Sequence, residues 1–329
     1  MTFNYDSETE LPRRGYRSDM KLALATLLCL CISACMSEPP KGTGPHTFDV
    51  GPGRRFEKPS DVAALVGPGD IVKIAPGTYA DCAVWPGSAP GLKLIGTDGK
   101  VTLADKVCAD KAIFVVQGDD TLVRGITFKG AKSSDHNGAG IRLESRKLTI
   151  EDSHFVGNED GILTFSTPQG ELVIRNSSFE NNGNCIECGH GLYVGHFAHV
   201  RIEHSTFVGQ HTGHHIKSRA ANTEIIDTIV RDGPDGTSSY LVDIPNGGNL
   251  MMLGDTLEKG PLAENKTTAI SIGAEGVNNP TNSIRILNCV FTNNTGGQTA
   301  FVTTYTDAPI ELNGNTLNGD IVELRRVSR

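Results

Sequence analysis

The chain has 329 residues, with 38 glycines, 6% aromatic residues and a formal net charge of −8. This length allows one large domain or two. The acidic balance, without any basic run, argues against nucleic acid as a partner, and it disfavours a polyanionic ligand unless positive residues gather in a cleft.

The N-terminus has the features of an export signal. Met20 and Lys21 precede a mostly apolar run at 22–31, which is too short to span a membrane and typical of a signal peptide. The sequence Ile-Ser-Ala-Cys at 32–35 resembles the bacterial lipobox, which implies lipidation of Cys35. The alternative is an ordinary signal peptide with a chance cysteine. We expect a signal over 1–35, with a true start at Met20, and a lipoprotein of the bacterial outer membrane or the periplasm that contacts the membrane only through its anchor.

The segments that follow predict a tether and a cap. Residues 36–58 are rich in Pro, Gly and Lys, which is typical of a flexible tether. Residues 59–65 predict a short capping helix with Ser60 as its N-cap, placed where it would cover one open end of a sheet. We expect the main domain to occupy 59–317 and a C-terminal tail to occupy 318–329.

One six-residue pattern recurs eight times in the main domain. It begins with an aliphatic residue and ends on phenylalanine or another apolar residue, and its last residues lie 23 to 34 positions apart. Such a period, in units too short for a helix, indicates a solenoid of strands, whose coils must stack to bury their apolar faces. The pattern occupies residues 123–128, 150–155, 174–179, 202–207, 225–230, 252–257, 286–291 and 312–317.

Each coil is expected to contain three strands. Between the first and second strands the sequence predicts a tight bend, at which equivalent side chains of successive coils lie about 4.8 Å apart. These residues are expected to form a structural ladder of hydrogen bonds up the stack. They are Asp152, Asn176, His204, Asp227 and Asn288.

A family resemblance supports this fold. Residues 67–79, Gly-Pro-Gly-Asp-Ile-Val-Lys-Ile-Ala-Pro-Gly-Thr-Tyr, resemble the opening segment of many polysaccharide-active β-helix proteins. The resemblance spans roughly 59–317 and is to pectate-lyase-like proteins. It implies an all-β chain that folds as a right-handed, single-stranded parallel β-helix.

Six cysteines remain after the expected signal. Export allows disulfides, and Cys82 with Cys108 is a plausible pair near the start of the solenoid. Cys185 and Cys188 are expected either to bridge a loop or to bind metal with His190, although a full zinc site needs more ligands at recognisable spacing.

The third strand of each coil is where chemistry is expected. Because strand side chains alternate, inward-pointing Ile216 and Val242 would leave their neighbours exposed, and a shift of one residue would reverse every assignment. The outward set is then Arg142, Glu144, Tyr193, His215, Lys217, Arg219, Asp243 and Ser271. Lys217 and Asp243 occupy equivalent positions and are expected to be neighbours.

Histidines concentrate next to these strands. Seven of the ten histidines lie between His190 and His215, and a solenoid brings residues one coil apart into contact. His204 is expected in the bend ladder and His214 in the core. We expect the cluster as a whole to be a ligand site, with the alternative that Lys217 and Asp243 form a simple surface ion pair.

Cleavage of a uronate polysaccharide by β-elimination would use these residue types. It requires a partner for the carboxylate, a base for the C5 proton and an acid for the leaving oxygen. Arg219 suits the carboxylate, Lys217 or His215 the base, and Tyr193 or His190 the acid. The residues expected to bind substrate are Arg142, Asp243 and His211.

The resemblance leaves three functions open. A polysaccharide lyase or C5-epimerase is the first. A glycoside hydrolase using Asp160, Asp235 or Asp243 is the second, since 158–161, 189–191 and 216–217 resemble polygalacturonase blocks, although the paired aspartates of that family have no counterpart. A non-catalytic, glycan-binding or structural β-helix is the third.

The expected ligand is an acidic polysaccharide or another glycan, and the expected state is a monomer. Some members of the resembled families use calcium. Asp232 and Asp235, together with Asp243, are candidate ligands, but their spacing shows no calcium-loop signature.

Overall fold

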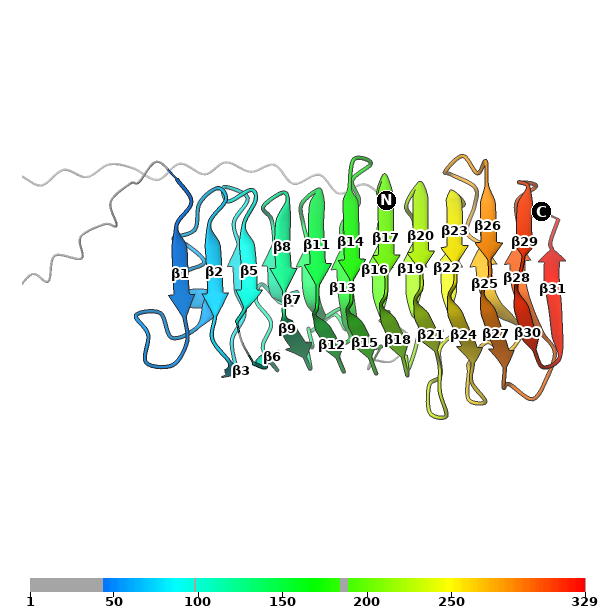
Figure 1. Ribbon diagram of the computed structural model, residues 1–329, viewed down its shortest axis with the longest axis horizontal. Helices are drawn as coiled ribbons and strands as arrows, with labels where there is room; N and C mark the ends of the chain where they lie inside the picture. The colour runs from blue at the N-terminus through cyan, green and yellow to red at the C-terminus, as the bar shows by residue number, and fades with distance from the viewer. Residues whose placement is uncertain (1–43, 98, 184–188, 329) are drawn as a thin grey trace, which may run out of the picture. The chain divides into compact units, whose positions relative to one another are not determined.

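A computed structural model describes residues 44–97, 99–183 and 189–328. These residues form an all-β solenoid of about 11 turns, in which three parallel sheets run the length of the stack (Figure 1). The expected signal, Cys35, Cys185 and Cys188 lie outside the described residues. In the part of the chain that is described, no helix has the length and apolar character needed to cross a membrane.

Sheet A contains the first strand of each coil, at the front in Figure 1. Its eleven strands are β1 (Thr47–Val50), β2 (Ile71–Ile74), β5 (Lys93–Gly96), β8 (Thr121–Arg124), β11 (Lys147–Glu151), β14 (Glu171–Arg175), β17 (His199–Glu203), β20 (Asn222–Ile226), β23 (Asn249–Leu253), β26 (Ile284–Leu287) and β29 (Ile310–Asn313).

Sheet B contains the second strands, which follow the tight bends. Its ten strands are β3 (Gly77–Tyr79), β6 (Val101–Ala104), β9 (Ile126–Lys129), β12 (His154–Val156), β15 (Ser178–Glu180), β18 (Thr206–Val208), β21 (Ile229–Arg231), β24 (Thr256–Lys259), β27 (Val290–Asn293) and β30 (Thr316–Asn318).

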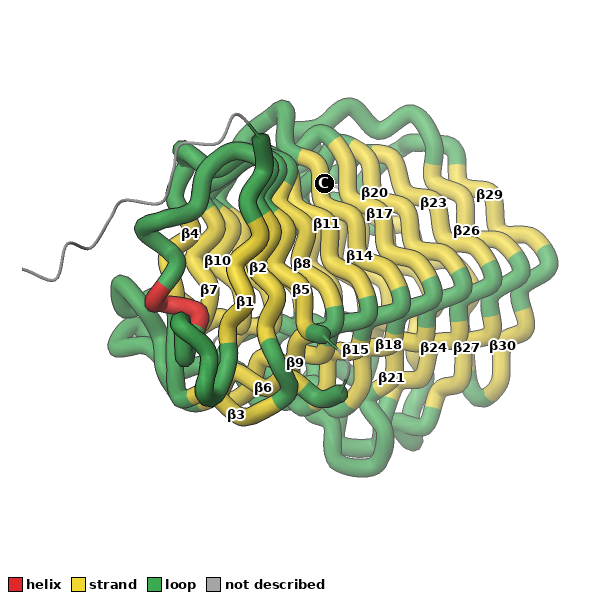
Figure 2. Tube along the Cα trace, turned by 60° about the vertical axis from the view of Figure 1, so that its left-hand side comes forward, coloured by secondary structure: helices red, strands yellow, loops and turns green. Residues whose placement is uncertain are grey.

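Sheet C contains the third strands and lies behind sheet A in Figure 1. Its ten strands are β4 (Ala83–Trp85), β7 (Ala112–Val116), β10 (Ala139–Leu143), β13 (Asp160–Thr164), β16 (Leu192–Val194), β19 (Ile216–Ser218), β22 (Val242–Ile244), β25 (Thr268–Ile272), β28 (Thr299–Thr304) and β31 (Ile321–Arg326). Figure 2 shows how the coils stack in register.

The core is built from the repeated apolar positions. The last residue of the pattern forms a file of rings, in which Phe155 stacks on Phe179 at 4.6 Å and Phe179 on Phe207 at 4.3 Å between ring centroids. All three side chains are buried. The three-strand coil and the buried repeat positions expected from the sequence are therefore confirmed.

The tight bends have a second structural layer that the sequence did not indicate. All five expected bend residues have the left-handed backbone, with φ between 48° and 54°, which Asp and Asn tolerate better than most residues. The hydrogen-bond ladder, however, is made by the residue that follows each bend. The backbone N–H of Ser153 donates to Ser177 Oγ, that of Ser177 to Ser205 Oγ, and that of Thr228 to Asp255 Oδ1.

Asp255 is expected to make stability depend on pH. Burial raises the pKa of this carboxyl to about 8, although the N–H of Thr228 opposes the shift. A carboxyl with a raised folded-state pKa contributes stability that is present below about pH 4 and is lost as the pH rises towards 8. Between about pH 4 and pH 8, we expect the free energy of unfolding of the wild type to fall by roughly 2–5 kcal/mol more than that of Asp255→Ser. Urea unfolding at each pH measures this difference. Asp152→Asn, at another exposed bend, is the control, and equal slopes in all three proteins would contradict the prediction.

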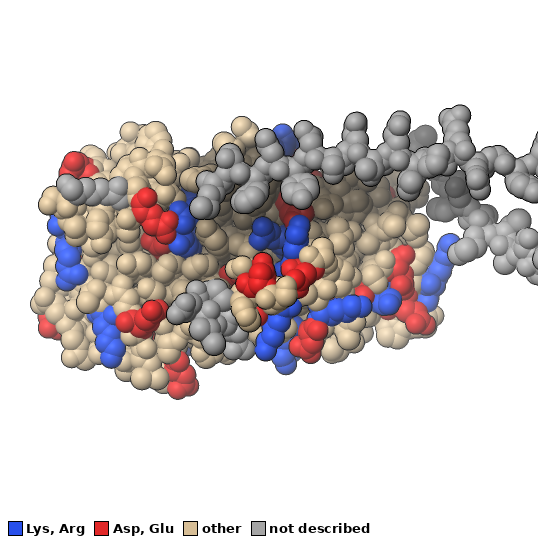
Figure 3. Space-filling model, turned by 180° about the vertical axis from the view of Figure 1, so that it is seen from behind, with Lys and Arg blue, Asp and Glu red and all other residues tan. Residues whose placement is uncertain are grey.

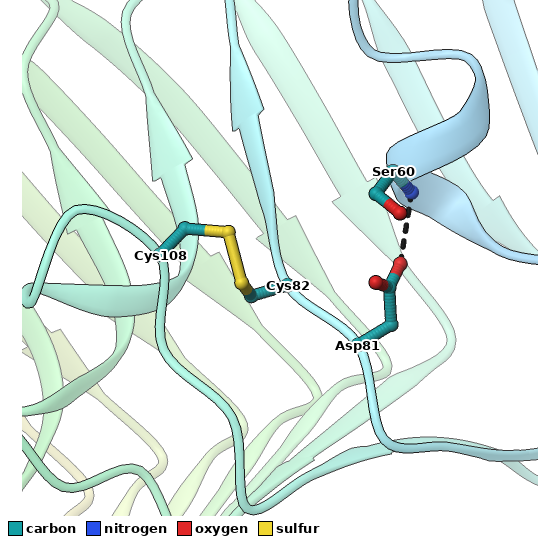
Figure 4. The surroundings of a disulfide bond; sticks show 4 residues. All are labelled: Ser60, Asp81, Cys82 and Cys108. Atoms are coloured by element: carbon teal, nitrogen blue, oxygen red, sulfur yellow. Dashed lines mark hydrogen bonds between the residues drawn. A yellow bond between two sulfur atoms is a disulfide. The ribbon is translucent and has the colours of Figure 1, made fainter.

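The N-terminal end of the solenoid differs from the expected capping helix. The described residues contain no α-helix, and 59–65 include a single 3₁₀ turn, Pro59–Asp61. Its cap is Lys58 and not Ser60, whose N–H donates to Asp81 Oδ2 at 2.8 Å (Figure 4). The segment is too short for α-helical hydrogen bonds before Gly67 and Pro68, yet Val62 still packs on the core.

The strands continue past both expected boundaries of the main domain. β1 lies in the segment expected to be a tether and pairs with β2. β31 lies in the expected tail and pairs with β28. The predicted disulfide between Cys82 and Cys108 is confirmed (Figure 4).

Candidate active site

One outward file of side chains crosses sheet C. The register pairs Tyr193 with Lys217, Lys217 with Asp243, and Asp243 with Ser271. Ile216 and Val242, which flank the file, are fully buried. The predicted inward and outward assignment is thus confirmed for these strands, as is the contact between Lys217 and Asp243, whose charged atoms are 3.9 Å apart.

Two cations of this face hold one carboxylate between them. Lys217 Nζ lies 3.0 Å from Glu275 Oε1, and Arg219 Nη2 lies 2.6 Å from Glu275 Oε2. The two cationic side chains are only 12% and 17% exposed, whereas that of Glu275 is 45% exposed. We call Lys217 and Arg219 the cation clamp. Glu275 was missed in the sequence because it is 58 residues from Lys217, in a loop without a repeat pattern.

Tyr193 lies against the cation clamp. Arg219 Nε donates to the Tyr193 hydroxyl oxygen at 3.0 Å. The Lys217 ammonium and the Arg219 guanidinium lie 5.5 and 5.7 Å from the centroid of the tyrosine ring, within the range of a cation–π contact. Arg219 also donates to Asn246 Oδ1, a second partner that the sequence did not indicate. The phenol is therefore held in a fixed place beside two positive charges.

Two histidines form one wall of the cluster. The His190 and His214 rings lie 5.0 Å apart. Nδ1 of His190 accepts the N–H of His214, and Nδ1 of His214 accepts the N–H of Tyr240. Burial, followed by the charge of Lys217, lowers the pKa of His190 to about 3. Burial, followed by the neighbouring His190, lowers the pKa of His214 well below its usual value. Both rings are therefore neutral at pH 7, with their proton on Nε2.

Asp243 connects the histidine wall to the cation clamp. Its carboxylate lies 3.4 Å from Nε2 of His214, and its side chain is only 3% exposed. Burial raises the pKa of Asp243 to about 7, although the charge of Lys217 acts in the opposite direction. Asp243 therefore changes its charge near neutral pH, directly beside Lys217.

The structure reverses the predicted roles of His214 and His215. His215 was expected to point outward as a base, but it is buried and Nε2 donates to Asp232 Oδ1 at 3.0 Å. His214 was expected in the core, but it faces the cluster. β19 begins at Ile216, so both histidines precede the strand, and Gly213, with φ 62°, turns the chain there. Strand alternation does not apply to them.

Only some of the other predicted site residues lie near the cluster. Arg142 lies on the same file, two coils from Tyr193, because both pair with Leu163. His211 lies in the loop before β19, where its N–H donates to Asn182 O. Among the candidate hydrolytic acids, Asp160 is buried behind His190 and accepts its N–H at 2.7 Å, whereas Asp235 is exposed in the loop after β21.

The residues considered for calcium do not fit a calcium site. The Asp232 carboxylate is buried, accepts hydrogen bonds from Ser238 Oγ and the N–H of Gly260, and lies 3.6 Å from Lys259 Nζ. That ammonium already neutralises it, and a divalent cation would face a like charge. Across the described residues, no group of three or more His, Cys, Asp or Glu could hold a metal ion.

A groove adjoins the cluster on sheet C. It has a volume of about 320 Å³ and places Arg142, Leu163 and Tyr193 beside Phe165, whose side chain is 37% exposed. Figure 3 views the side opposite to sheet A and shows acidic and basic side chains lying close together in the middle of it. Nε of Arg142 is buried without a hydrogen-bond partner. The groove thus offers a cation and an exposed aromatic ring next to the cation clamp.

Larger grooves lie elsewhere, over sheet B. They measure about 530 and 580 Å³, overlap, and include Lys100, Thr127 and Glu180. They contain no cluster comparable to the cation clamp with Tyr193. We therefore place the candidate site by its chemistry, on sheet C.

Comparisons with known proteins agree on the fold. A family model described as a right-handed beta helix region matches residues 88–189, and no curated protein sequence matches the chain. The crystal structure of a pectate lyase is similar with a TM-score of 0.57, at 12% identity, over 85% of this chain and 79% of that one.

Two further solved structures are similar to a lesser degree. A pectin methylesterase from carrot has a TM-score of 0.44 at 13% identity, covering 88% of this chain and 91% of that one. An alginate lyase from Paenibacillus sp. has a TM-score of 0.43 at 14% identity, covering 84% and 99%. At such identities the likeness is one of fold, and the chain folds as a right-handed parallel β-helix, as the pectate lyase does.

Proposed function

We propose that this protein is a polysaccharide lyase, or a C5-epimerase, that binds a uronate-containing polysaccharide on sheet C. The observation that carries the proposal is the cation clamp, which already closes on a carboxylate next to the hydroxyl of Tyr193. The pectate lyase among the structural relatives acts, by its name, on such a polymer. Arg219 supplies the fork geometry that suits a carboxylate.

The geometry narrows the proposed chemical roles. His215 is buried in a pair with Asp232 and does not reach the face. Lys217 and Arg219 together bind the substrate carboxylate. Their positive charges stabilise the negative charge that develops when C5 loses its proton. Tyr193 then moves the proton. Its oxygen accepts from Arg219 Nε, and the two cations around it stabilise negative charge on that oxygen during the transfer.

The elimination step is as follows. Tyr193, as phenolate, takes the proton from C5, and the electron pair left on C5 forms the C4=C5 double bond. The bond from C4 to the glycosidic oxygen breaks, and that oxygen takes the proton from Tyr193, which returns to phenolate. In an epimerase C5 would instead regain a proton on its other face. Arg142 and Phe165 would bind further sugar units along the groove.

A panel of polymers tests this proposal. The purified protein is incubated with alginate, pectate, glucuronan and glycosaminoglycans, with and without calcium. Ultraviolet absorbance follows unsaturated uronate, reducing ends are counted in parallel, and exchange of the C5 proton is followed by NMR. Absorbance or exchange that is lost in Arg219→Ala is the expected result. New reducing ends without ultraviolet absorbance would support a hydrolase instead. No change in any of the three readouts would overturn the proposal for these polymers and favour a non-catalytic glycan-binding protein.

We also propose that the protein is exported and anchored through Cys35. The proposal rests on the sequence of residues 20–35, and the disulfide between Cys82 and Cys108 supports it, because such bonds persist in oxidising compartments. Labelling with a fatty-acid analogue in a bacterial host tests the anchor. Label that is lost in Cys35→Ser is expected, and an unlabelled wild type would contradict it.

A further inference from the structure

Glu275 occupies the place that the proposed function assigns to the substrate carboxylate. Its two oxygens contact the two cations separately, Oε1 with Lys217 and Oε2 with Arg219. A carboxylate on a sugar has the same charge and the same two oxygens. A uronate cannot bind both cations in this way while Glu275 does, so the two must compete for the cation clamp.

The backbone of the Glu275 loop is fixed independently of this contact. The N–H of Glu275 donates to Pro245 O at 2.8 Å, and the N–H groups of Asn278 and Asn279 both donate to Asn246 O at 3.0 Å. The Asn279 side chain donates to the carbonyl oxygens of Arg219 and Ala220. The loop can therefore stay in place when the Glu275 side chain moves, and that side chain is already 45% exposed.

Resting on the proposed function, we infer that Glu275 is a specificity-determining residue, an internal carboxylate that a uronate must displace from the cation clamp. The charge-assisted contacts of Glu275 must be lost before the substrate's contacts form. A ligand with its own carboxylate replaces them and restores the charge balance. A neutral sugar cannot, because displacing Glu275 would leave Arg219, which is only 17% exposed, without a carboxylate and Lys217 with Asp243 alone. The site thus selects acidic sugars over neutral ones.

Binding measurements on the wild type and four variants test the inference. Titration calorimetry measures the Kd of oligogalacturonate, oligomannuronate and a neutral cello-oligosaccharide of equal length. Glu275→Gln is expected to bind an acidic oligomer roughly ten-fold more tightly than the wild type. Glu275→Asp keeps the charge but is too short to reach both cations, and is expected to fall between the two.

A matched control separates competition from net charge. Glu311 also contacts an arginine, Arg285, at 2.7 Å and is similarly exposed, at 49%, but it lies on sheet A. Glu311→Gln changes the net charge equally and is expected to leave the Kd unchanged. Thermal unfolding checks that each variant is folded.

The outcomes distinguish the inference from the proposed function. Acidic oligomers that bind the wild type and Glu275→Gln equally, with binding lost in Arg219→Ala, would overturn the inference and leave the proposed function standing. Loss of cleavage in Glu275→Gln at an unchanged Kd would also overturn it, by giving Glu275 a part in the chemistry. Absence of binding to every folded variant would overturn both. An equal gain of affinity in Glu311→Gln would reduce the effect to net charge and overturn the inference.

Discussion

Replacing Tyr193 by phenylalanine is expected to lower the rate of uronate cleavage by about 10²–10⁴-fold, the range associated with one positioned acid–base group. The substitution removes only the oxygen that accepts from Arg219 Nε. The ring remains and still carries the cation–π contacts with Lys217 and Arg219. The cation clamp should therefore still bind the carboxylate, and KM should change by less than about ten-fold.

Steady-state kinetics on the polymer that the panel identifies would check this result. Tyr79→Phe is the matched control, since Tyr79 lies in β3 on sheet B and its hydroxyl donates to Ala75 O. A Tyr193→Phe protein within ten-fold of the wild-type kcat would exclude Tyr193 from the proton transfer. A large rise in KM at an unchanged kcat would instead make Tyr193 a binding residue.

Replacing Phe179 by alanine is expected to destabilise the protein by about 3–5 kcal/mol, the usual cost of deleting a buried phenylalanine. Its ring lies between two others, 4.6 Å from Phe155 and 4.3 Å from Phe207 between centroids. Deletion would interrupt this file in the middle of the core. The coil cannot close the gap, because the strands of all three sheets hold its backbone in register.

Urea unfolding followed by circular dichroism measures this loss. Phe165→Ala is the control, because Phe165 is the same residue type but is 37% exposed, and its loss is expected to change the free energy of unfolding by less than about 1 kcal/mol. Equal effects of the two substitutions would show that the file of rings contributes no special stability.

Much of the fold could be predicted because the solenoid repeats its local rules. An apolar residue at the same place in successive coils must pack on its equivalents, which is why the phenylalanines could be placed in the core. Asp152 and Asn176 marked the bends because few other residues tolerate their left-handed backbone. Lys217 and Asp243 could be paired because both lie inside regular strands, where alternation and register hold.

The features that could not be predicted lie in parts of the chain that do not repeat. His214 and His215 precede a strand, and a periodic rule says nothing about a turn around Gly213. Glu275 and Asn246 reach Arg219 from other coils, and Asn246 is 27 residues away in sequence. Loop length varies from coil to coil, so no spacing predicts such a contact.

The amino-acid sequence was thus sufficient to predict the β-helix, the identity of its core positions and the face on which charged residues gather. Local periodicity is sufficient for these, since every coil buries its apolar side chains by the same alternation. The sequence did not show which histidine faces the cluster, nor that Glu275 lies between Lys217 and Arg219. Those contacts join segments whose separation in the chain follows no period, and they form only when the stacked coils bring the loops together.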